Sequence, residues 1–357
     1  MNNIKDSLTG TRYIVIAASI VIILTGINLA QSVVVLFLVS MFLALLGSSM
    51  VLWLKEKHVP SGLSVLIVMS AMIIVVIMIG AQIGTSISGF SDELPQLQER
   101  IREQVVKLSA LLTEKGIKVN EKFFLEYVNP ESIMKLTAGL LTGLSSMLSD
   151  LFLILLTVAF ILLEVSSFPK KIRVILGDPQ QVFPRFTKFI IDMQRYMIIK
   201  TVISLITGVL VGLWLLIIGV DYPLLWGFLV FLLNFIPNIG SIIAAVPPVL
   251  LSFVQLGVGH AALTLAGFLV VNTILGNMIE PRLMGRKLGL STLVVFLSLI
   301  FWGNLLGSIG AILSVPLTMT LKFAFEGNEK THWIAVILGS EKFIEGSTPV
   351  YKRKKEM

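Results

Sequence analysis

Residues 234–249 have the sequence NFIPNIGSIIAAVPPV and interrupt the most apolar part of the chain. They lie between Tyr222 and Ile279, a run that contains no Asp, Glu, Lys or Arg. Such a run predicts membrane helix, because about 20 consecutive apolar residues cross the hydrocarbon core of a bilayer. The quoted stretch nevertheless holds three prolines, two asparagines and a glycine, which favour turns over helix. Since non-helical backbone survives at membrane depth only if protein or water shelters it, we expect a bend between two short helices.

Composition indicates an integral membrane protein. Of its 357 residues, 55% are hydrophobic and 14% are charged, whereas soluble domains carry about 25% charged residues. Repeated apolar stretches predict an all-α fold, a multi-pass transmembrane helical bundle in the lipid bilayer. The net charge of +7 needs no nucleic-acid partner, because membrane proteins concentrate Lys and Arg in cytoplasmic loops. The chain has no cysteine, so disulfide and thiolate chemistry are excluded.

The first part, residues 1–87, is expected to hold three transmembrane helices. Residues 13–27 and 33–54 are apolar on either side of the short interruption NLAQS, which predicts a tight hairpin of two helices. The third helix is expected over residues 63–87, after the basic segment KEKH. The first helix is interpreted as retained, because no cleavage-like site follows it.

Residues 88–142 have a soluble composition and predict a small extracytoplasmic helical insertion. Asn129 and Pro130 predict a helix start within it, because Asn caps a helix and Pro fits the first turn. An amphipathic helix is predicted by apolar residues that recur every three or four positions: Leu97, Ile101, Val105, Leu108 and Leu112.

Charge sets the remaining divisions. Residues 143–200 are expected to combine a fourth membrane helix, over 144–165, with a basic and irregular cytoplasmic loop over 168–200. Residues 201–326 predict a transmembrane transport core with broken helices, and residues 327–357 a cytoplasmic tail.

Basic loops belong in the cytoplasm, which predicts that both termini lie there and that residues 88–142 lie outside. Each uncharged block of the core must then start and end on the same side. It therefore contains an even number of crossings or a re-entrant hairpin. The bends are expected at residues 237–240 and 303–310, and the two hairpins would enter the membrane from opposite sides.

No enzyme motif is present. The sequence lacks the serine-hydrolase elbow, the zinc-protease HExxH pattern, a P-loop and a dinucleotide-binding glycine pattern. The three histidines, His58, His260 and His332, do not cluster in the sequence. We therefore predict no catalytic residue, no cofactor and no metal site.

The broken stretch supplies the first candidate transport residues. Transporters use broken helices because the freed N–H and C=O groups face the substrate. Five residues fit this description: Asn234, Pro237, Asn238, Gly240 and Ser241. The alternative is an ordinary turn between two helices at the membrane surface.

The next helix carries a second polar group. Asn272 and Asn277 are candidates for the solute pathway, and Asn277 shares a helix face with Glu280. Glu280 and Arg282 are candidates for gating or proton coupling, because a carboxylate within the membrane is a functional candidate. In the alternative, Glu280 only ends its helix in water beside Arg282. Asp221, which borders the uncharged block, is a further gating candidate.

Several glycine pairs have the spacing that permits close contact between membrane helices. They are Gly80/Gly84, Gly139/Gly143, Gly208/Gly212 and Gly303/Gly307. The spacing alone does not distinguish contact within one chain from contact between chains.

Two C-terminal blocks resemble the signature of the autoinducer-2 exporter family of bacterial membrane proteins. They are LLNFIPNIGSIIAAVPPVL and GNMIEPRLMGRKLGLSTLVVFLSLIFWGNLLGSIGAILSVPLT. The resemblance extends over nearly the whole chain. The residues of these blocks most resemble the branch of the family that is assigned to transport of autoinducer-2 itself. Where that branch often has an aromatic residue, this chain has Asn304, a further candidate for the pathway.

The resemblance implies about eight membrane helices, a location in the bacterial cytoplasmic membrane and a homo-oligomer. It also implies export of autoinducer-2, a small polyhydroxylated quorum-sensing signal. Other members of the family are assigned sodium or lithium/proton antiport, so that function is an alternative. A second alternative is a non-transporting membrane scaffold that binds partners through residues 88–142.

Overall fold

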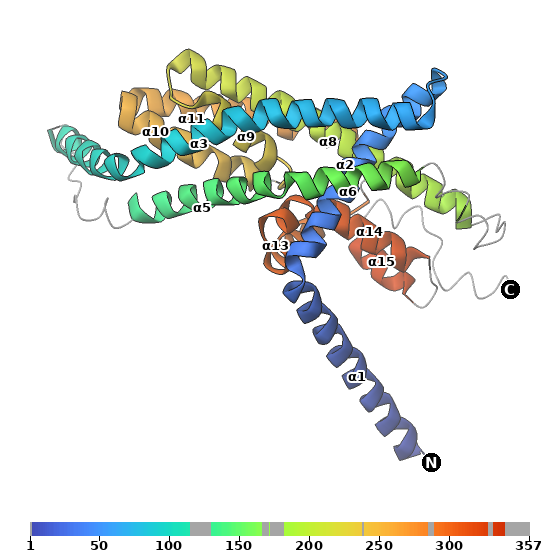
Figure 1. Ribbon diagram of the computed structural model, residues 1–357. Helices are drawn as coiled ribbons and strands as arrows, with labels where there is room; N and C mark the ends of the chain where they lie inside the picture. Colours follow the sequence, from blue (N-terminus) through green and yellow to red (C-terminus); the bar gives the residue numbers. More distant parts are fainter. Residues whose placement is uncertain are drawn as a thin grey trace.

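A computed structural model describes seven parts of the chain: residues 2–114, 130–165, 171, 182–237, 239–284, 289–327 and 331–339. Within these parts every regular secondary-structure element is a helix, and the only β-type pairing is an isolated bridge between Leu290 and Gly339. The all-α fold class is therefore confirmed. Figure 1 shows the helices gathered along one long axis, with the N-terminal helix leaving the body.

The two N-terminal helices do not form the predicted hairpin. Helix α1 (Asn2–Leu29) and helix α2 (Gln31–Glu56) meet at Ala30, where the chain changes direction, and α1 projects away from the other helices (Figure 1). Helical hydrogen bonds continue across the junction, from the N–H of Ala30 to the carbonyl of Gly26 and from that of Val34 to Ala30. The prediction of a hairpin was wrong because NLAQS contains neither Gly nor Pro, so the chain bends at Ala30 without reversing its direction.

Helix α3 (Ser61–Glu114) joins two predicted elements into one. It has 54 residues, which corresponds to a length of about 80 Å. Its membrane-compatible portion ends at Glu93, and the helix then continues into the region predicted as the insertion. Helices α5 (Pro130–Ser149) and α6 (Leu151–Val165) follow. Residues 135–146 and 151–164 are bent by 50° relative to one another.

Helix α8 (Val182–Ile218) replaces much of the predicted irregular loop. The prediction for residues 182–200 was wrong, because the basic residues obscured a helical pattern. Lys188 and Arg195 are exposed, whereas Met193, Tyr196 and Met197 are buried on the opposite face. An amphipathic helix of this kind continues directly into the apolar span that ends at Ile218.

The first uncharged block is bent where the sequence predicts. Helix α9 (Pro223–Leu233) ends at Asn234, and helix α10 (Gly240–Leu256) begins after a short turn. Pro247 and Pro248 lie inside α10 without dividing it. Helix α11 (Val258–Asn272) starts after Gly257, whose φ is 87°. The π-helix η1 (Thr273–Ile279) and the short helix α12 (Glu280–Met284) complete this span.

The second uncharged block is also bent, within the predicted segment 303–310. Helix α13 (Thr292–Ile312) kinks at Gly307, whose φ of 69° suits glycine, and helix α14 (Ser314–Glu326) packs back against it. The Trp302 indole N–H donates to Thr318 Oγ1 at 3.0 Å and joins the two helices. Helix α15 (His332–Leu338) packs against α14, so part of the predicted tail is structured.

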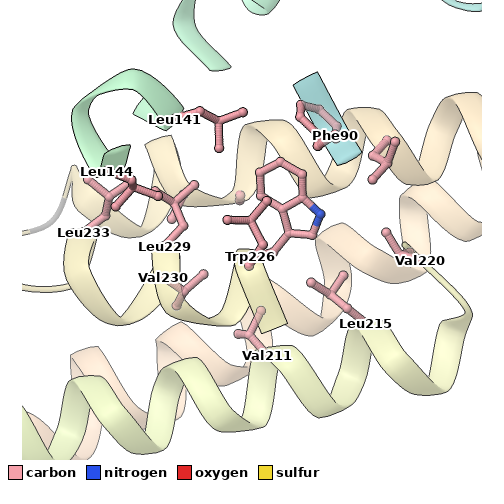
Figure 2. Close-up of a cluster of buried hydrophobic side chains, with 14 of the residues drawn as sticks. Phe90, Leu141, Leu144, Val211, Leu215, Val220, Trp226, Leu229, Val230 and Leu233 are labelled. Carbon is pink, nitrogen blue, oxygen red and sulfur yellow. The ribbon is translucent and has the colours of Figure 1, made fainter. Parts of the chain in front are cut away.

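The core is organised around Trp226, which is fully buried. Figure 2 shows its indole ring among apolar side chains from α3, α5, α8 and α9. Phe90 meets the indole edge-on, with ring centroids 5.0 Å apart and an interplanar angle of 90°. This arrangement favours aromatic pairs. A second core lies among α2, α6, α8, α13 and α14.

The outer surface is apolar, as a lipid-facing surface requires. Within the described residues, five helices are long and apolar enough to cross a membrane, or six if the bent pair counts as one span. The chain is therefore a multi-pass membrane protein. The expected count of about eight is not confirmed by these helices. Three further helices are apolar but too short to be counted as spans: Ile14–Leu29, Pro223–Leu233 and Gly240–Leu256.

Glycines bring α8 and α9 into backbone contact. A Cβ atom at Gly208 would lie 2.5 Å from the carbonyl oxygen of Gly227, and one at Gly227 would lie 3.3 Å from Gly212 Cα. The Gly208/Gly212 pair therefore packs within the chain. This contact holds α9, and the turn that follows it, directly against α8.

Candidate functional site

A line of buried polar side chains runs along α8. Lys200, Ser204 and Thr207 are spaced by four and three residues, so they share one face of the helix. All three are buried. We call these three residues the α8 stripe. Polar groups buried in an apolar helix bundle require partners, and two of the three residues find theirs in the irregular segments described next.

The turn after α9 meets the stripe at Ser204. Asn234 is buried where α9 ends, and its Nδ2 donates to Ser204 Oγ at 2.9 Å. Thr207, one turn further along, donates to the carbonyl of Ile203 within its own helix. The broken stretch therefore places its first polar side chain against α8, because the glycine contact holds α9 there.

The π-helix meets the stripe at Lys200. Lys200 Nζ donates to Glu280 Oε1 at 2.6 Å, and the two side chains are only 6% and 15% exposed. The backbone N–H of Glu280 bonds to the carbonyl of Leu275, five residues back. Pro281 has no N–H to donate to the carbonyl four residues before it, so the α-helical hydrogen-bond pattern is already interrupted at this point.

The stripe thus joins two groups that are distant in the sequence. Asn234 and Glu280 contact adjacent turns of the same helix face, about 6 Å apart along its axis. Lys200, Ser204 and Thr207 are not among the residues predicted from the sequence. Their spacing of four and three is visible there, but the charge of Lys200 favours a basic loop and isolated hydroxyl residues are common in membrane helices.

Other candidates from the broken stretch have structural roles or lie beside the site. A Cβ atom at Gly240 would lie 1.8 Å from the carbonyl oxygen of Leu233, so the turn requires glycine at this position. Pro237 and Ser241 are half-buried in or next to the turn. Asn238 lies outside the described residues.

The remaining candidates do not join the stripe. Asn272 is half-buried, and its side-chain oxygen lies over Gly276 in the π-helix. Three others are exposed on the surface of the chain: Asn277, Arg282 and Asn304. Asp221 is exposed too, and its carboxylate accepts a hydrogen bond from Gln255 Nε2 at 2.5 Å.

The segment between α8 and α9 is tied to α3. The Tyr222 hydroxyl donates to Glu93 Oε1 at 2.9 Å, and its ring packs edge-on against Phe90. Burial against these neighbours raises the pKa of Tyr222 to about 12, and the hydrogen bond and the negative charge of Glu93 add to the effect. Tyr222 also has a left-handed backbone, with φ of 57°, directly before the first residue of α9.

The sequence that forms this site matches a known protein family. The model of the AI-2E family transporter matches residues 17–328. The chain belongs to the AI-2E transporter family. The match includes the broken stretch, the π-helix and the second hairpin, so all residues of the proposed site lie within the AI-2E region.

Individual AI-2E relatives match over almost their full length. The AI-2 transport protein TqsA of Escherichia coli (strain K12) is 40% identical over 332 residues, covering 93% of this chain and 96% of the relative. YhhT of the same strain, named for transport without a stated solute, is 36% identical over 339 residues, covering 95% and 97%. A transport protein of Haemophilus influenzae is 35% identical over 341 residues, covering 94% and 98%. Family membership makes this chain a membrane transporter.

Proposed function

We propose that this AI-2E transporter exports autoinducer-2 across the bacterial cytoplasmic membrane. One structural observation carries the proposal: an amide and two hydroxyl groups, from Asn234, Ser204 and Thr207, are buried together at a helix break. The name of the relative TqsA supports the choice of solute.

The chemistry of these groups suits a neutral solute with several hydroxyl groups. Amide and hydroxyl side chains both donate and accept hydrogen bonds, so they can exchange partners with such a solute. The one fixed positive charge of the stripe, Lys200, is balanced by Glu280. The Thr201 hydroxyl, next to Lys200, is buried and has no hydrogen-bond partner among the described residues. A solute hydroxyl would satisfy it.

The proposal includes an orientation. Both termini would lie in the cytoplasm, with the far part of α3 outside and the two hairpins entering from opposite sides. The divisions at residues 87, 142, 200 and 326 are proposed as functional units, and α3, α5 and α8 run through the first three of them. The exposed apolar side chains of α1 between Ile14 and Leu29 would meet lipid or a second copy in a homo-oligomer. An ion gradient or the solute gradient would drive export.

Transport in proteoliposomes tests the proposal. Purified protein is reconstituted, and efflux of labelled autoinducer-2 is measured with and without an imposed proton gradient. Asn234→Ala and Ser204→Ala should each reduce efflux by about tenfold, because each breaks a buried hydrogen bond of the site. Ser19→Ala is the matched control, since Ser19 is exposed on α1. Absence of efflux from sealed vesicles that contain the parent protein would disprove the proposal.

Cation/proton antiport is the second candidate function, and the Lys200–Glu280 pair is the observation that favours it. A carboxylate in the membrane that has an ammonium partner can exchange that partner for a sodium or lithium ion. The same vesicles, loaded with a pH-sensitive dye, would show sodium-dependent proton movement if antiport occurs. Glu280→Gln should then abolish it, whereas Glu56→Gln, at the exposed end of α2, should not. Absence of both fluxes would favour a scaffold.

A further inference from the structure

Lys200 is a buried charge whose purpose stability alone does not explain. It lies on α8 within an apolar bundle, and its ammonium bonds to Glu280 at 2.6 Å. Removing two charges from water is unfavourable, and apolar residues of similar size often stabilise a protein as well as a buried ion pair does. A function in transport is therefore the more informative explanation to test.

The ion pair and the π-helix depend on one another. In the π-helix the N–H of Glu280 bonds to the carbonyl of Leu275, five residues back. In an α-helix the same N–H would bond to Gly276, and every following residue would rotate by about 100° around the helix axis. That rotation would carry the Glu280 carboxylate away from Lys200. Holding Glu280 at Lys200 therefore also holds residues 273–279 in the π form.

This segment lies next to the polar groups that we assign to the solute. Ser204 follows Lys200 by one helical turn on the same face. Leu275, within the π-helix, is buried, whereas Asn277 two residues later is exposed. The π-helix thus has an inner side that is closed to solvent in this arrangement.

We propose that Lys200 is a positioning residue for transport, which holds Glu280 and thereby keeps the π-helix closed beside the stripe. When water or a polar solute enters the stripe, it solvates both charged groups, the pair separates and the segment is free to leave the π form. The proposal rests on the proposed transport function but not on the identity of the solute.

Cysteine labelling tests the closure without any solute. The chain has no cysteine, so Leu275→Cys introduces a single thiol on the inner side of the π-helix. A hydrophilic maleimide should label it slowly in the parent. Labelling should be about tenfold faster when Lys200→Met and Glu280→Met are combined, the change expected from losing a charge-assisted hydrogen bond. Lys200→Arg should keep labelling slow, and Lys188→Met, exposed on the same helix, is the control.

Glu280→Gln gives a second reading, because it keeps the shape of the side chain and removes its charge. It should accelerate labelling as the double variant does. Labelling at the parent rate in both variants, measured on monodisperse protein, would overturn the proposal.

Efflux distinguishes a positioning role from a structural one. The double variant should reduce the maximal rate by about tenfold while the apparent KM stays within about twofold, because binding groups remain but the closing step is lost. Exchanging the two charges, by Lys200→Glu with Glu280→Lys, should restore much of the rate. If the parent transports no autoinducer-2 but the labelling difference is present, the proposed solute is wrong and the role of Lys200 stands. If the parent transports and the double variant matches it in both measurements, the role of Lys200 is wrong.

Discussion

Lys200 and Glu280 lie 80 positions apart in the sequence, yet their side chains form an ion pair of 2.6 Å in the interior of the bundle. One comes from an unbroken helix and the other from the end of a π-helix. The ion pair thus holds the end of the π-helix at a fixed distance from α8.

Lys200→Met alone should destabilise the protein strongly. The substitution leaves the Glu280 carboxylate buried without its partner, a change that typically costs about 3–5 kcal/mol. Adding Glu280→Met should recover most of this loss, because the buried charge is then absent. Denaturant unfolding in detergent, followed by tryptophan fluorescence, measures both. Lys188→Met should unfold like the parent, and equal stability of parent and Lys200→Met would contradict the expectation.

Gly208→Ala should weaken the contact between α8 and α9. The new Cβ atom would lie 2.5 Å from the Gly227 carbonyl oxygen, so the two backbones must separate. We expect a loss of about 1–3 kcal/mol, the usual range for overpacking. Gly84→Ala is the control, because a Cβ atom there meets nothing within 4 Å. It should be neutral or stabilising by up to about 1 kcal/mol, given the higher helix propensity of alanine. Unfolding midpoints of the two variants that moved in the opposite order would refute the packing argument.

Gly240→Ala should reduce efflux as strongly as Asn234→Ala does. The Cβ atom cannot fit 1.8 Å from the Leu233 carbonyl oxygen, so the turn must open and move Asn234 away from Ser204. Gly259→Ala, in α11 with open space around its Cβ position, should leave efflux unchanged. Parent-like efflux in Gly240→Ala would mean that the turn does not position Asn234 for transport.

Tyr222→Phe should change the stability of the protein at alkaline pH. The pKa of the folded phenol, about 12, exceeds its ordinary value of 10.0. The stabilising contribution of the neutral hydroxyl is therefore present below pH 10 and is lost as the pH rises through about 12. The difference in unfolding midpoint between parent and variant should shrink across this interval. A difference that stays constant from pH 10 to pH 12 would show that the hydroxyl does not titrate there.

Much of the fold could be predicted from single-sequence patterns. The bends at residues 237–240 and near Gly307 were predictable, because Pro, Asn and Gly stop helices for local reasons. The junction at Ala30 is a change of direction and not a hairpin, since apolar composition reveals a membrane helix but not how far a polar interruption turns the chain. The continuity of α8 could not be predicted, because the basic residues of this segment favour a loop. The burial of Met193, Tyr196 and Met197 becomes visible only in the structure.

The site could be predicted only in part. Asn234 and Glu280 were visible as polar residues in or next to an uncharged block, but their partners on α8 were not. Pairing across 30 and 80 positions depends on how the helices pack. Close packing of α8 and α9 depends in turn on Gly227, which no glycine pair indicated. A single sequence gives the spacing of residues along a helix but not the helix that faces them.

The continuity of α8 has a mechanical consequence. Its 37 residues run without a break past both irregular segments that contact the stripe. We therefore expect bending at two hinges, the turn before Gly240 and the π-helix before Glu280, while α8 stays rigid and both hinges remain in contact with it. A substitution that displaces α8 should therefore move both hinges together, whereas a substitution within one hinge should leave the position of the other unchanged.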